Sequence, residues 1–381
     1  MRIMYISGLI EPQTFYKLRE KYNISIGLQQ QKFHECFTNG LNQNNVNTLI
    51  ISNFQVEPGN LDQTLKFKYM KNDNLIYMPF TKYKPSKVSN ILQFISMIYR
   101  GVKYGKHIDY IFCDYINVGY TLSSVIISKI IKKPLVYIVT DVPAEYLNNN
   151  VMSIDDRIRI TLSKQAKKCI FITNQISELP IFKGIDYFVY EGSITDNYYN
   201  SLCEKKKTVV YTGLLSKDDG ILNLLTAWSR LSTTYTLVLI GRICDDEIRI
   251  AINEIKGVNY LGALSNDVCM KYQREATFLI NTRLLDNVYN KYSFPSKVIE
   301  YLASGTTLLS TPIECLFNNF EYRNHIEFFE GDDVDSIYDT LKKVLSNPKE
   351  YLEKGKEAQK FMYSNKTSEM YISKMIDKLG L

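Results

Sequence analysis

Short runs of apolar and β-branched residues recur along the first half of the chain, and longer segments with polar faces separate them. The runs cover Arg2–Ser7, Val46–Asn53, Tyr110–Asp114, Pro134–Thr140 and Cys169–Thr173. Continuous apolar runs of this length are typical of parallel strands buried on both faces of a sheet. Since Thr121–Lys132 and Asp155–Lys168 are long enough to be crossover helices, the pattern predicts βαβ units in a doubly wound sheet.

The pattern stops near the middle of the chain and then starts again. The stretch from Gly192 to Lys207 is polar and follows neither the helical nor the strand period, which predicts a linker. Further strands are predicted at Thr208–Gly213, Thr234–Gly241, Val258–Gly262, Ala276–Thr282 and Thr306–Thr311. Further helices are predicted at Asp219–Leu231, Asp245–Lys256, Ser265–Arg274 and Ser296–Ser304. The fold class is therefore α/β, with two Rossmann-like domains in series.

The predicted boundaries divide the chain into four parts. They are an N-terminal domain over residues 1–195, a linker over 196–207, a C-terminal domain over 208–365 and a final helix over 366–381. Within that last part, Thr367–Leu379 carries Ile372, Met375, Ile376 and Leu379 on one apolar stripe, which is typical of a helix that docks on another surface.

Composition limits the class of protein. The chain has 381 residues, of which 45% are hydrophobic and 23% charged, enough to form two globular cores. The seven cysteines form no C-x-x-C pair, and the three histidines are scattered, so neither a disulfide framework nor a zinc site is expected. No run of apolar residues is long enough to span a membrane, and the first strand begins without a leader pattern. We therefore expect a reduced, cytoplasmic enzyme without a metal.

The positive charge is confined to one half of the chain. Residues 1–200 carry 23 Lys and Arg against 16 Asp and Glu, whereas residues 201–381 carry 23 against 24. A basic N-terminal half indicates either an anionic partner, such as a phosphate-bearing acceptor or a lipid surface, or a solvated lysine-rich face. Within it, Ser86–His107 is an apolar helix with Lys87, Arg100, Lys103 and Lys106. This helix is either interfacial on anionic lipid or a buried crossover helix with a basic end.

The most informative stretch is NTRLLDNVYNKYSFPSKVIEYLASG, from Asn281 to Gly305. Ser293 or a neighbour can cap a helix whose first turn holds Pro295, Ser296 and Lys297, and Gly305 can end it. A helix start with added hydroxyl and ammonium groups suits a phosphate. Glu300, one turn further, could accept hydrogen bonds from two ribose hydroxyls. The alternative is a well-capped helix with a surface Lys and Glu.

These motifs resemble the GT-B glycosyltransferases of family 4, the group that contains bacterial exopolysaccharide, capsule and O-antigen transferases. YSFPSKVIEYLASG resembles the donor-site signature of that family, and VVYTGLLSKDDGILNLLTAW resembles its first C-domain strand, glycine loop and helix. GLQQQKFHECFTNGL and VYIVTDVP resemble two segments of its N-domain. The resemblance covers nearly the whole chain and implies two Rossmann-like domains with a cleft between them. It also implies that the last helix, over residues 366–381, crosses back to the N-domain.

The resemblance assigns roles to individual residues. It implies that Glu300 binds the donor ribose and that Gly213 faces the donor diphosphate, while the backbone at Gly262 contacts the base. The residues implied near the donor sugar and diphosphate are Tyr292, Ser293, Phe294, Pro295 and Ser296. Gly27 and His34 lie on the N-domain loop and helix that are implied to approach acceptor or donor phosphate.

Four positions depart from the family pattern. Tyr292 stands where a second Glu is frequent, Leu214 and Asp219 where an Arg and a Lys are usual, and Thr140 where many members have a catalytic His. A departing diphosphate needs positive charge, so other cations must supply it.

Lys297 and Arg283 are the first candidates for that charge because they share one loop with Glu300. Lys217 follows, and Arg242 is either a further candidate or an exposed loop residue. Asp141, at the end of an apolar strand, could orient an acceptor hydroxyl or cap the next helix. The candidate catalytic residues are therefore Asp141, Lys297 and Arg283.

The family resemblance leads to a functional hypothesis for this chain. The resemblance implies a retaining transfer of a hexose from a nucleoside-diphosphate sugar to a saccharide acceptor, in the synthesis of surface polysaccharide, with no metal or other cofactor. The expected acceptor is lipid-linked and is held by the basic N-terminal domain, so peripheral contact with the inner face of the cell membrane is expected, and no nucleic acid. The alternatives are a non-catalytic GT-B subunit of a transferase complex and a nucleotide-sugar epimerase.

Overall fold

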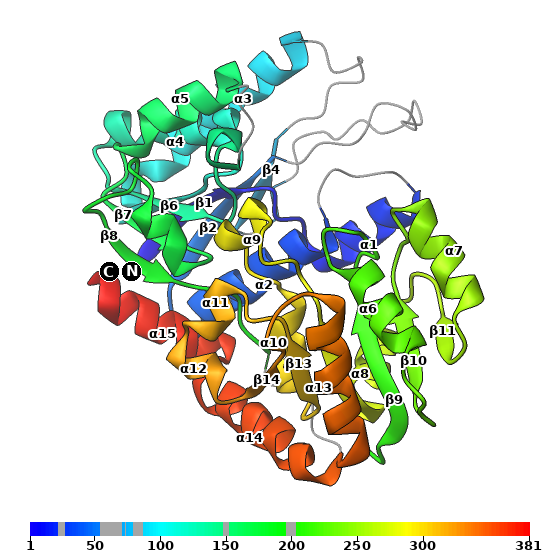
Figure 1. The fold of residues 1–381 in the computed structure, drawn as a ribbon. Coiled ribbons are helices and arrows are strands. Elements are labelled where there is room, and N and C mark those ends of the chain that lie inside the picture. The colour runs from blue at the N-terminus through cyan, green and yellow to red at the C-terminus, as the bar shows by residue number, and fades with distance from the viewer. Residues whose placement is uncertain (22–26, 54–70, 73, 79–86, 148–151, 196–202) are drawn as a thin grey trace. The chain divides into compact units, whose positions relative to one another are not determined.

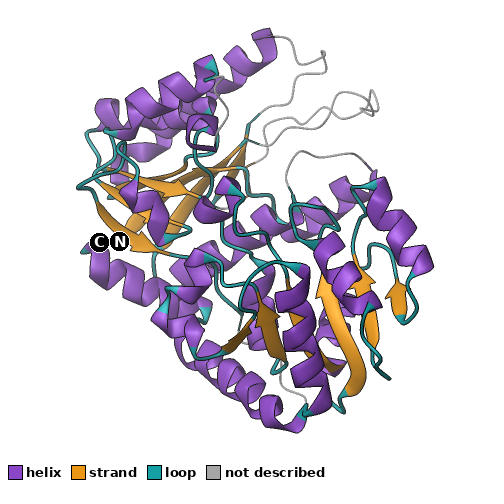
Figure 2. Ribbon diagram, viewed as in Figure 1, coloured by secondary structure: helices purple, strands orange, loops and turns teal. Residues whose placement is uncertain are grey.

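The computed structural model describes residues 1–21, 27–53, 71–72, 74–78, 87–147, 152–195 and 203–381. The chain divides into two compact units. We call Met1–Ser193 together with Ser368–Leu381 the N-terminal unit, and Ile194–Thr367 the C-terminal unit. Each unit is a largely parallel sheet with helices packed against it (Figure 2), which confirms the predicted α/β class with two Rossmann-like sheets.

The N-terminal unit contains an eight-stranded sheet in the order β3-β4-β2-β1-β5-β6-β7-β8. Its strands are β1 (Arg2–Ser7), β2 (Asn47–Ser52), β3 (Lys71–Asn72), β4 (Leu75–Tyr77), β5 (Tyr110–Asp114), β6 (Leu135–Val139), β7 (Lys168–Phe171) and β8 (Asp186–Val189). Neighbouring strands are parallel except for the β3–β4 pair. The chain moves outward from β1 through β2 to one edge and from β5 through β8 to the other. The carboxyl ends of β1 and β5 therefore form the switch point at which such sheets bind ligands.

Helices cover both faces of this sheet (Figure 1). They are α1 (Pro12–Lys21), α2 (Leu28–Gln43), α3 (Lys87–Tyr104), α4 (Val118–Ile131), α5 (Ile154–Ser163) and α15 (Ser368–Leu379), with 3₁₀ turns at Gly105–His107, Ala144–Leu147 and Asn174–Glu178. In Figure 1 α3, α4 and α5 lie on one face, while α2 and α15 lie on the other. The last helix therefore packs in the N-terminal unit, where Ile372 and Met375 join Phe37 and Leu41 of α2 in one buried core.

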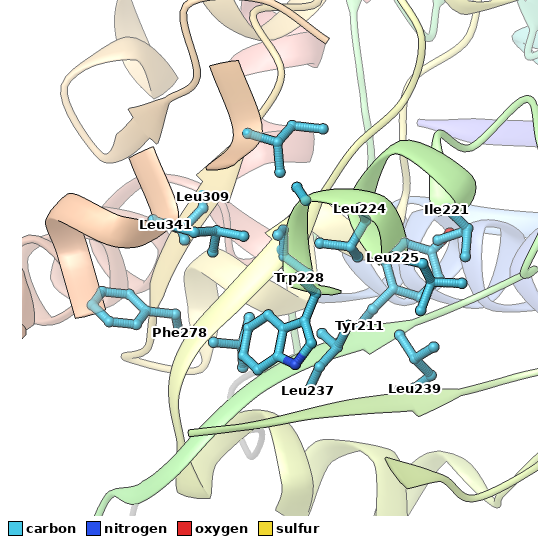
Figure 3. Close-up of a cluster of buried hydrophobic side chains, with 14 of the residues drawn as sticks. Tyr211, Ile221, Leu224, Leu225, Trp228, Leu237, Leu239, Phe278, Leu309 and Leu341 are labelled. Atoms are coloured by element: carbon cyan, nitrogen blue, oxygen red, sulfur yellow. The ribbon is translucent and has the colours of Figure 1, made fainter. Parts of the chain in front are cut away.

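The C-terminal unit contains a six-stranded parallel sheet in the order β11-β10-β9-β12-β13-β14. Its strands are β9 (Lys206–Thr212), β10 (Thr236–Ile240), β11 (Val258–Tyr260), β12 (Ala276–Asn281), β13 (Thr307–Ser310) and β14 (Ile326–Phe328). Its helices are α6 (Ile221–Ser229), α7 (Asp246–Glu254), α8 (Asn266–Glu275), α9 (Val288–Tyr292), α10 (Lys297–Ala303), α11 (Glu314–Phe317), α12 (Phe320–Arg323), α13 (Val334–Ser346) and α14 (Lys349–Asn365). Helices α6, α7 and α13 bury one core against the strands, with Trp228 and Phe278 inside it (Figure 3).

The structure agrees with the predicted strands and adds elements that the apolar pattern did not reveal. Strand Tyr110–Asp114 has the predicted bounds, while β9 begins at Lys206, inside the segment assigned to the linker. The added elements include β4, β8, β14, α13 and α14. The added strands β3, β4, β8 and β14 are only two to four residues long, which is too short for a periodic signal. Among the described residues, no helix has both the length and the apolar character needed to cross a membrane.

The packing of α15 on α2 generates a prediction. Gly40 lies inside α2, and a Cβ atom there would come within 2.4 Å of the Ser368 carbonyl oxygen and 2.5 Å of Ile372 Cγ1. We expect Gly40→Ala to lower the free energy of unfolding by about 1–3 kcal/mol, because the overlap outweighs the roughly 1 kcal/mol that Ala gains in a helix. Urea denaturation measures the loss. Gly27→Ala is the control, since a Cβ at Gly27 meets nothing within 4 Å; an equal loss in both variants would contradict the prediction.

Candidate functional site

The loops after β9 and β10 approach each other through two glycines. Gly213 has φ +140° and Gly241 has φ +148°, values that residues with a side chain rarely adopt. A Cβ atom at Gly241 would lie 1.7 Å from the carbonyl oxygen of Gly213. The paired loops are held by the Leu215 amide, which donates to the Arg242 carbonyl at 2.9 Å. The carboxyl edge of the sheet therefore carries bare backbone there, with the two glycine loops in direct contact.

The ammonium group of Lys297 lies beside this bare backbone. Its Nζ atom is 3.9 Å from the centroid of the Tyr211 ring and 3.7 Å from the position that a Cβ on Gly213 would take. Among the described residues, no carboxylate forms an ion pair with Lys297. The pKa of Lys297 is lowered to about 7, chiefly by burial, with Asp219 opposing the shift and the nearby Arg283 adding to it. A partly neutral lysine beside this glycine can take up a proton when an anion arrives.

Arg283 provides a second cation at the same edge. Its Nη1 atom donates to Ser293 Oγ at 2.9 Å, and its Nε atom lies 3.6 Å from Asp219 Oδ1. The other oxygen of Asp219 accepts a hydrogen bond from Ser216 Oγ at 2.7 Å. Both partners of the Arg283–Asp219 pair are largely buried, with 17% and 19% of their side chains exposed. The guanidinium group is therefore held in one place by groups from two loops.

Helix α10 carries Glu300 three residues after Lys297, which puts both on one side of the helix. Its start differs from the prediction in one respect. Ser293 does not cap this helix, because it follows α9 and accepts the bond from Arg283. Ser296 occupies the cap position without a side-chain cap bond. Gly305 follows the helix with φ +75°, as predicted for a terminating glycine.

Two amides near the start of α10 are already used. The Val298 amide donates to the Pro295 carbonyl at 2.8 Å, and the Ile299 amide to the Ser296 carbonyl at 3.3 Å. They do not donate to an outside phosphate in this conformation. Phe294 is also internal, with 4% of its surface exposed and its ring packed on Tyr322. The side chains of Lys297 and Arg283 therefore contribute more to this site than the helix terminus does.

Three other candidate residues are spread around the cluster. Lys217 is exposed and pairs with Glu247 of α7 at 2.7 Å, a bond that raises its pKa. Gly262 has φ +72° and open space around it, and its carbonyl accepts from the Gly241 amide at 2.8 Å. Tyr292 ends α9 with Lys291 over its ring. The structure thus brings Gly213, Lys297 and Arg283 together, but it turns Lys217 toward α7.

Sequence reasoning missed part of this cluster. It did not identify Gly241, the Tyr211 ring under Lys297, or the role of Asp219 as the partner of Arg283. A signal for the glycine was present, since the three predicted strands that open the second half each end in glycine, at Gly213, Gly241 and Gly262. The ion pair had no signal, because its partners lie 64 positions apart along the chain (283 − 219).

The N-terminal unit contains a cavity of about 450 Å³ at the carboxyl edge of its sheet. It lies at the switch point, between the loops after β1, β2 and β5 and the inner side of α3. Amides and one carboxylate line it, together with apolar and aromatic groups. The polar side chains are Gln30, Asn53, Asn90, Gln93, Asn117 and Asp155, and the apolar ones include Phe94, Met97 and Tyr120. No Lys or Arg is among the described residues that line it.

His34 does not face this cavity or the surface. It is fully buried, with Nδ1 2.5 Å from the Tyr5 hydroxyl and Nε2 3.1 Å from Asp114 Oδ2. Burial raises the pKa of Tyr5 well above its ordinary value, so the phenol keeps its proton and shares a hydrogen bond with Nδ1. Gln30, which lines the cavity, reaches the same Asp114 oxygen at 3.4 Å. The predicted contact of His34 with phosphate is therefore corrected: the ring bridges β1 and β5 in the core.

Gly27 and Asp141 lie at two other places in the N-terminal unit. Gly27 is the exposed cap residue of α2, with an ordinary φ of −65°. Asp141 follows β6, and burial raises the pKa of its carboxyl group while Arg159 opposes the shift. Arg159, which the sequence analysis missed, is buried and donates to the Tyr115 carbonyl at 2.7 Å and the Asp141 carbonyl at 3.3 Å. A nearly buried cation thus holds the loop that carries Asp141.

Within the described parts of the chain, no three His, Cys, Asp or Glu side chains are grouped to hold a metal ion. The positive charge at the carboxyl edge of the C-terminal sheet comes from side chains. The site offers two cations of different kinds, a held guanidinium and an ammonium with a lowered pKa. This combination suits an anion that spans several oxygens, such as a diphosphate.

One family model matches part of the chain. Residues 206–347, from β9 to the end of α13, match the family described as glycosyl transferases group 1. No curated protein sequence matches the chain.

Solved structures match the whole chain. The structure of Anabaena HepE in complex with UDP and glucose shares 13% sequence identity with this chain. The match covers 99% of each chain, with a TM-score of 0.66. The lipopolysaccharide outer core galactosyltransferase WaaB shares 15% sequence identity. The match covers 99% of this chain and 100% of WaaB, with a TM-score of 0.64. Sucrose-phosphate synthase from Thermosynechococcus elongatus shares 13% sequence identity. The match covers 100% of this chain and 99% of the synthase, with a TM-score of 0.65. The chain therefore has the GT-B fold.

The buried ammonium of Lys297 generates a prediction that needs no ligand. Below pH 7 the folded protein holds this charge at a cost, whereas the unfolded chain keeps the ordinary lysine pKa. Between the two values the unfolded chain binds more protons, so wild-type stability rises with pH. We expect Lys297→Met to gain stability relative to wild type near pH 6, and this margin to shrink by about 2–3 kcal/mol by pH 9. Urea denaturation at both pH values measures it, and a margin that does not change with pH would contradict the assignment.

Proposed function

We propose that the protein is a glycosyltransferase that moves a hexose from a nucleoside-diphosphate sugar to a saccharide acceptor, with retention of configuration. The observation that carries the proposal is the arrangement of Lys297 and Arg283 beside the bare backbone of Gly213, with Glu300 one turn along α10. The family match over residues 206–347 and the fold shared with HepE, which was solved with UDP-glucose, support it.

The donor diphosphate would lie against Gly213 and Gly241. In the family that the sequence resembles, an Arg and a Lys on the β9 loop usually face it, and here these positions are Leu214 and Asp219. The missing charge is supplied from the opposite loop by Lys297 and Arg283. Asp219 then holds Arg283 in place of carrying a cation itself. The site keeps two positive charges at the edge of the sheet, although they come from different positions.

These groups would act on the leaving group. As the bond between the sugar and the diphosphate breaks, negative charge grows on the diphosphate, and cations already in place stabilise it without reorganisation. Glu300 would accept hydrogen bonds from the ribose hydroxyls and so orient the donor. Asp141, on the loop held by Arg159, would accept a hydrogen bond from the acceptor hydroxyl. Retention without a protein nucleophile is what the family resemblance implies.

The cavity of the N-terminal unit suits the acceptor. Amide side chains such as Gln30, Asn90 and Gln93 can donate and accept hydrogen bonds with sugar hydroxyls, and Tyr120 and Phe94 offer apolar faces for the ring. Asn53 Oδ1 is buried there without a hydrogen-bond partner among the described residues. Because no cation is described in the lining, the group bound in it would be a neutral sugar instead of a phosphate.

A donor screen and a transfer assay test the proposal together. We expect one of the UDP-, GDP-, ADP- or TDP-sugars to raise the Tm, and Glu300→Ala to weaken that donor and slow transfer roughly tenfold or more. Glu353→Ala, on the exposed side of α14, is the matched control and should change neither. Free sugar formed from the donor without an acceptor would favour an epimerase. Donor binding with no transfer to any acceptor extract would favour a non-catalytic subunit.

Two lysines on the two sides of the site give a matched pair. We expect Lys297→Ala to weaken donor binding by tenfold or more, because it removes a cation next to the diphosphate. Lys217→Ala removes the same charge from a side chain that is paired with Glu247, and should change binding less than threefold. Calorimetric titration of both variants measures the difference. Equal losses, or a larger loss for Lys217→Ala, would place the diphosphate on the β9 loop instead.

A further inference from the structure

Helix α3 exposes an apolar face. Ile91, Leu92, Ile95 and Tyr99 are 50–61% exposed, although three of them are large aliphatic residues. At 100° per residue they fall within one third of the helix circumference, and Ile130 of the neighbouring α4 is 54% exposed as well. We call Ile91, Leu92, Ile95 and Tyr99 the α3 face. Contiguous exposed apolar groups of this kind mark a surface that contacts something else.

The α3 face does not line the cavity described above. The opposite side of α3 is buried, with Gln93 4% and Met97 1% exposed and with Gly101 packed closely on Ile127 of α4. The sequence is compatible with either an interfacial helix on anionic lipid or a buried crossover helix with a basic end, and the structure fits neither of these alone. One side of α3 is the wall of the cavity in the N-terminal unit, and the other side is open and apolar.

The surroundings of the α3 face are positively charged. Helices α3 and α4 and the 3₁₀ turn at 105–107 contain no acidic residue. Basic residues collect at the carboxyl ends of the two helices, which run side by side. They are Arg100, Lys103, Lys106, Lys129, Lys132 and Lys133. Lys103 lies 5.8 Å from the centroid of the Tyr99 ring, so charge and apolar surface meet on the same helix.

From this charge pattern we propose that the α3 face docks on an anionic lipid bilayer, with Ile91, Leu92, Ile95 and Tyr99 in the headgroup boundary and the lysines on lipid phosphates. An apolar stripe bordered by cations, in a helix that is not apolar enough to span a membrane, is the design of an interfacial helix. A second copy of the chain is a poorer occupant. A two-fold contact through this face would bring the same cations together.

The proposal goes beyond the proposed function and does not depend on transfer activity. If the docking proposal and the transferase proposal are both correct, α3 would contact the membrane with its outer side and the acceptor sugar with its inner side. Such a helix would hold the cavity next to the bilayer, where the sugar of a lipid-linked acceptor is found. The docking can be tested with vesicles alone, so a failure of docking is distinguishable from a failure of the transferase proposal.

Co-sedimentation with vesicles tests the docking. We expect the protein to bind vesicles of equimolar phosphatidylglycerol and phosphatidylcholine, to ignore pure phosphatidylcholine, and to dissociate as salt is added. The double variant Ile91→Ser with Ile95→Ser should bind tenfold more weakly or worse, because two apolar anchors are lost. The double variant Lys103→Glu with Lys106→Glu should bind more weakly still, since each lysine near an anionic surface strengthens binding roughly fivefold.

Matched controls come from the C-terminal unit, where Phe320 and Ile250 are 84% and 56% exposed. The double variant Phe320→Ser with Ile250→Ser should bind as wild type does. Because the single Trp, Trp228, is buried, a new Trp reports its own surroundings. Ile95→Trp should shift its emission to the blue on anionic vesicles, and Phe320→Trp should not. Unchanged binding by the α3 variants would overturn the proposal. So would dimers in solution that Ile91→Ser with Ile95→Ser separates.

Discussion

The C-terminal site depends on a cation that the fold holds at a cost. Lys297 lies on the Tyr211 ring with Arg283 nearby, and burial lowers its pKa to about 7. In the proposed function, a bound diphosphate would restore the charge of the ammonium group and so recover the free energy that the folded protein forgoes here. The bare backbone of Gly213 lies beside the ammonium group, and the Arg283–Asp219 pair keeps a second cation in place. The other parts of the proposed donor site can hold an anion only together with the ammonium group of Lys297.

The N-terminal unit has a different chemistry at the equivalent edge of its sheet. There Tyr5, His34 and Asp114 lie together in the core, with the His34 ring between the phenol and the carboxylate. The cavity above them is lined by amides and carries no described cation. The contrast fits our proposal that the edge of the C-terminal sheet binds an anionic leaving group and the edge of the N-terminal sheet binds a neutral sugar. The basic excess of this half lies partly on the outer ends of α3 and α4, away from the cavity.

The fold was largely predictable from the sequence because buried parallel strands leave continuous apolar runs, such as Tyr110–Asp114. Short edge strands such as β14 leave no such pattern, and they were missed. In the candidate site, the placement of Lys297 and Glu300 on one helix was predictable because both belong to one local motif, SFPSKVIE. It was not predictable where the partner comes from elsewhere in the chain. Nothing local shows that Asp219 holds Arg283, or that His34, in a polar segment, is fully buried.

The proton balance of donor binding tests the central claim most directly. Near pH 8, Lys297 is mostly neutral in the free protein, and the diphosphate of a nucleotide sugar does not itself titrate. Calorimetric titrations of the selected nucleotide sugar in buffers of different ionisation enthalpy should give an apparent enthalpy that depends on the buffer. The slope should correspond to uptake of most of one proton, and it should vanish in Lys297→Met. A wild-type enthalpy that is independent of the buffer would show that the ammonium group of Lys297 does not meet the diphosphate.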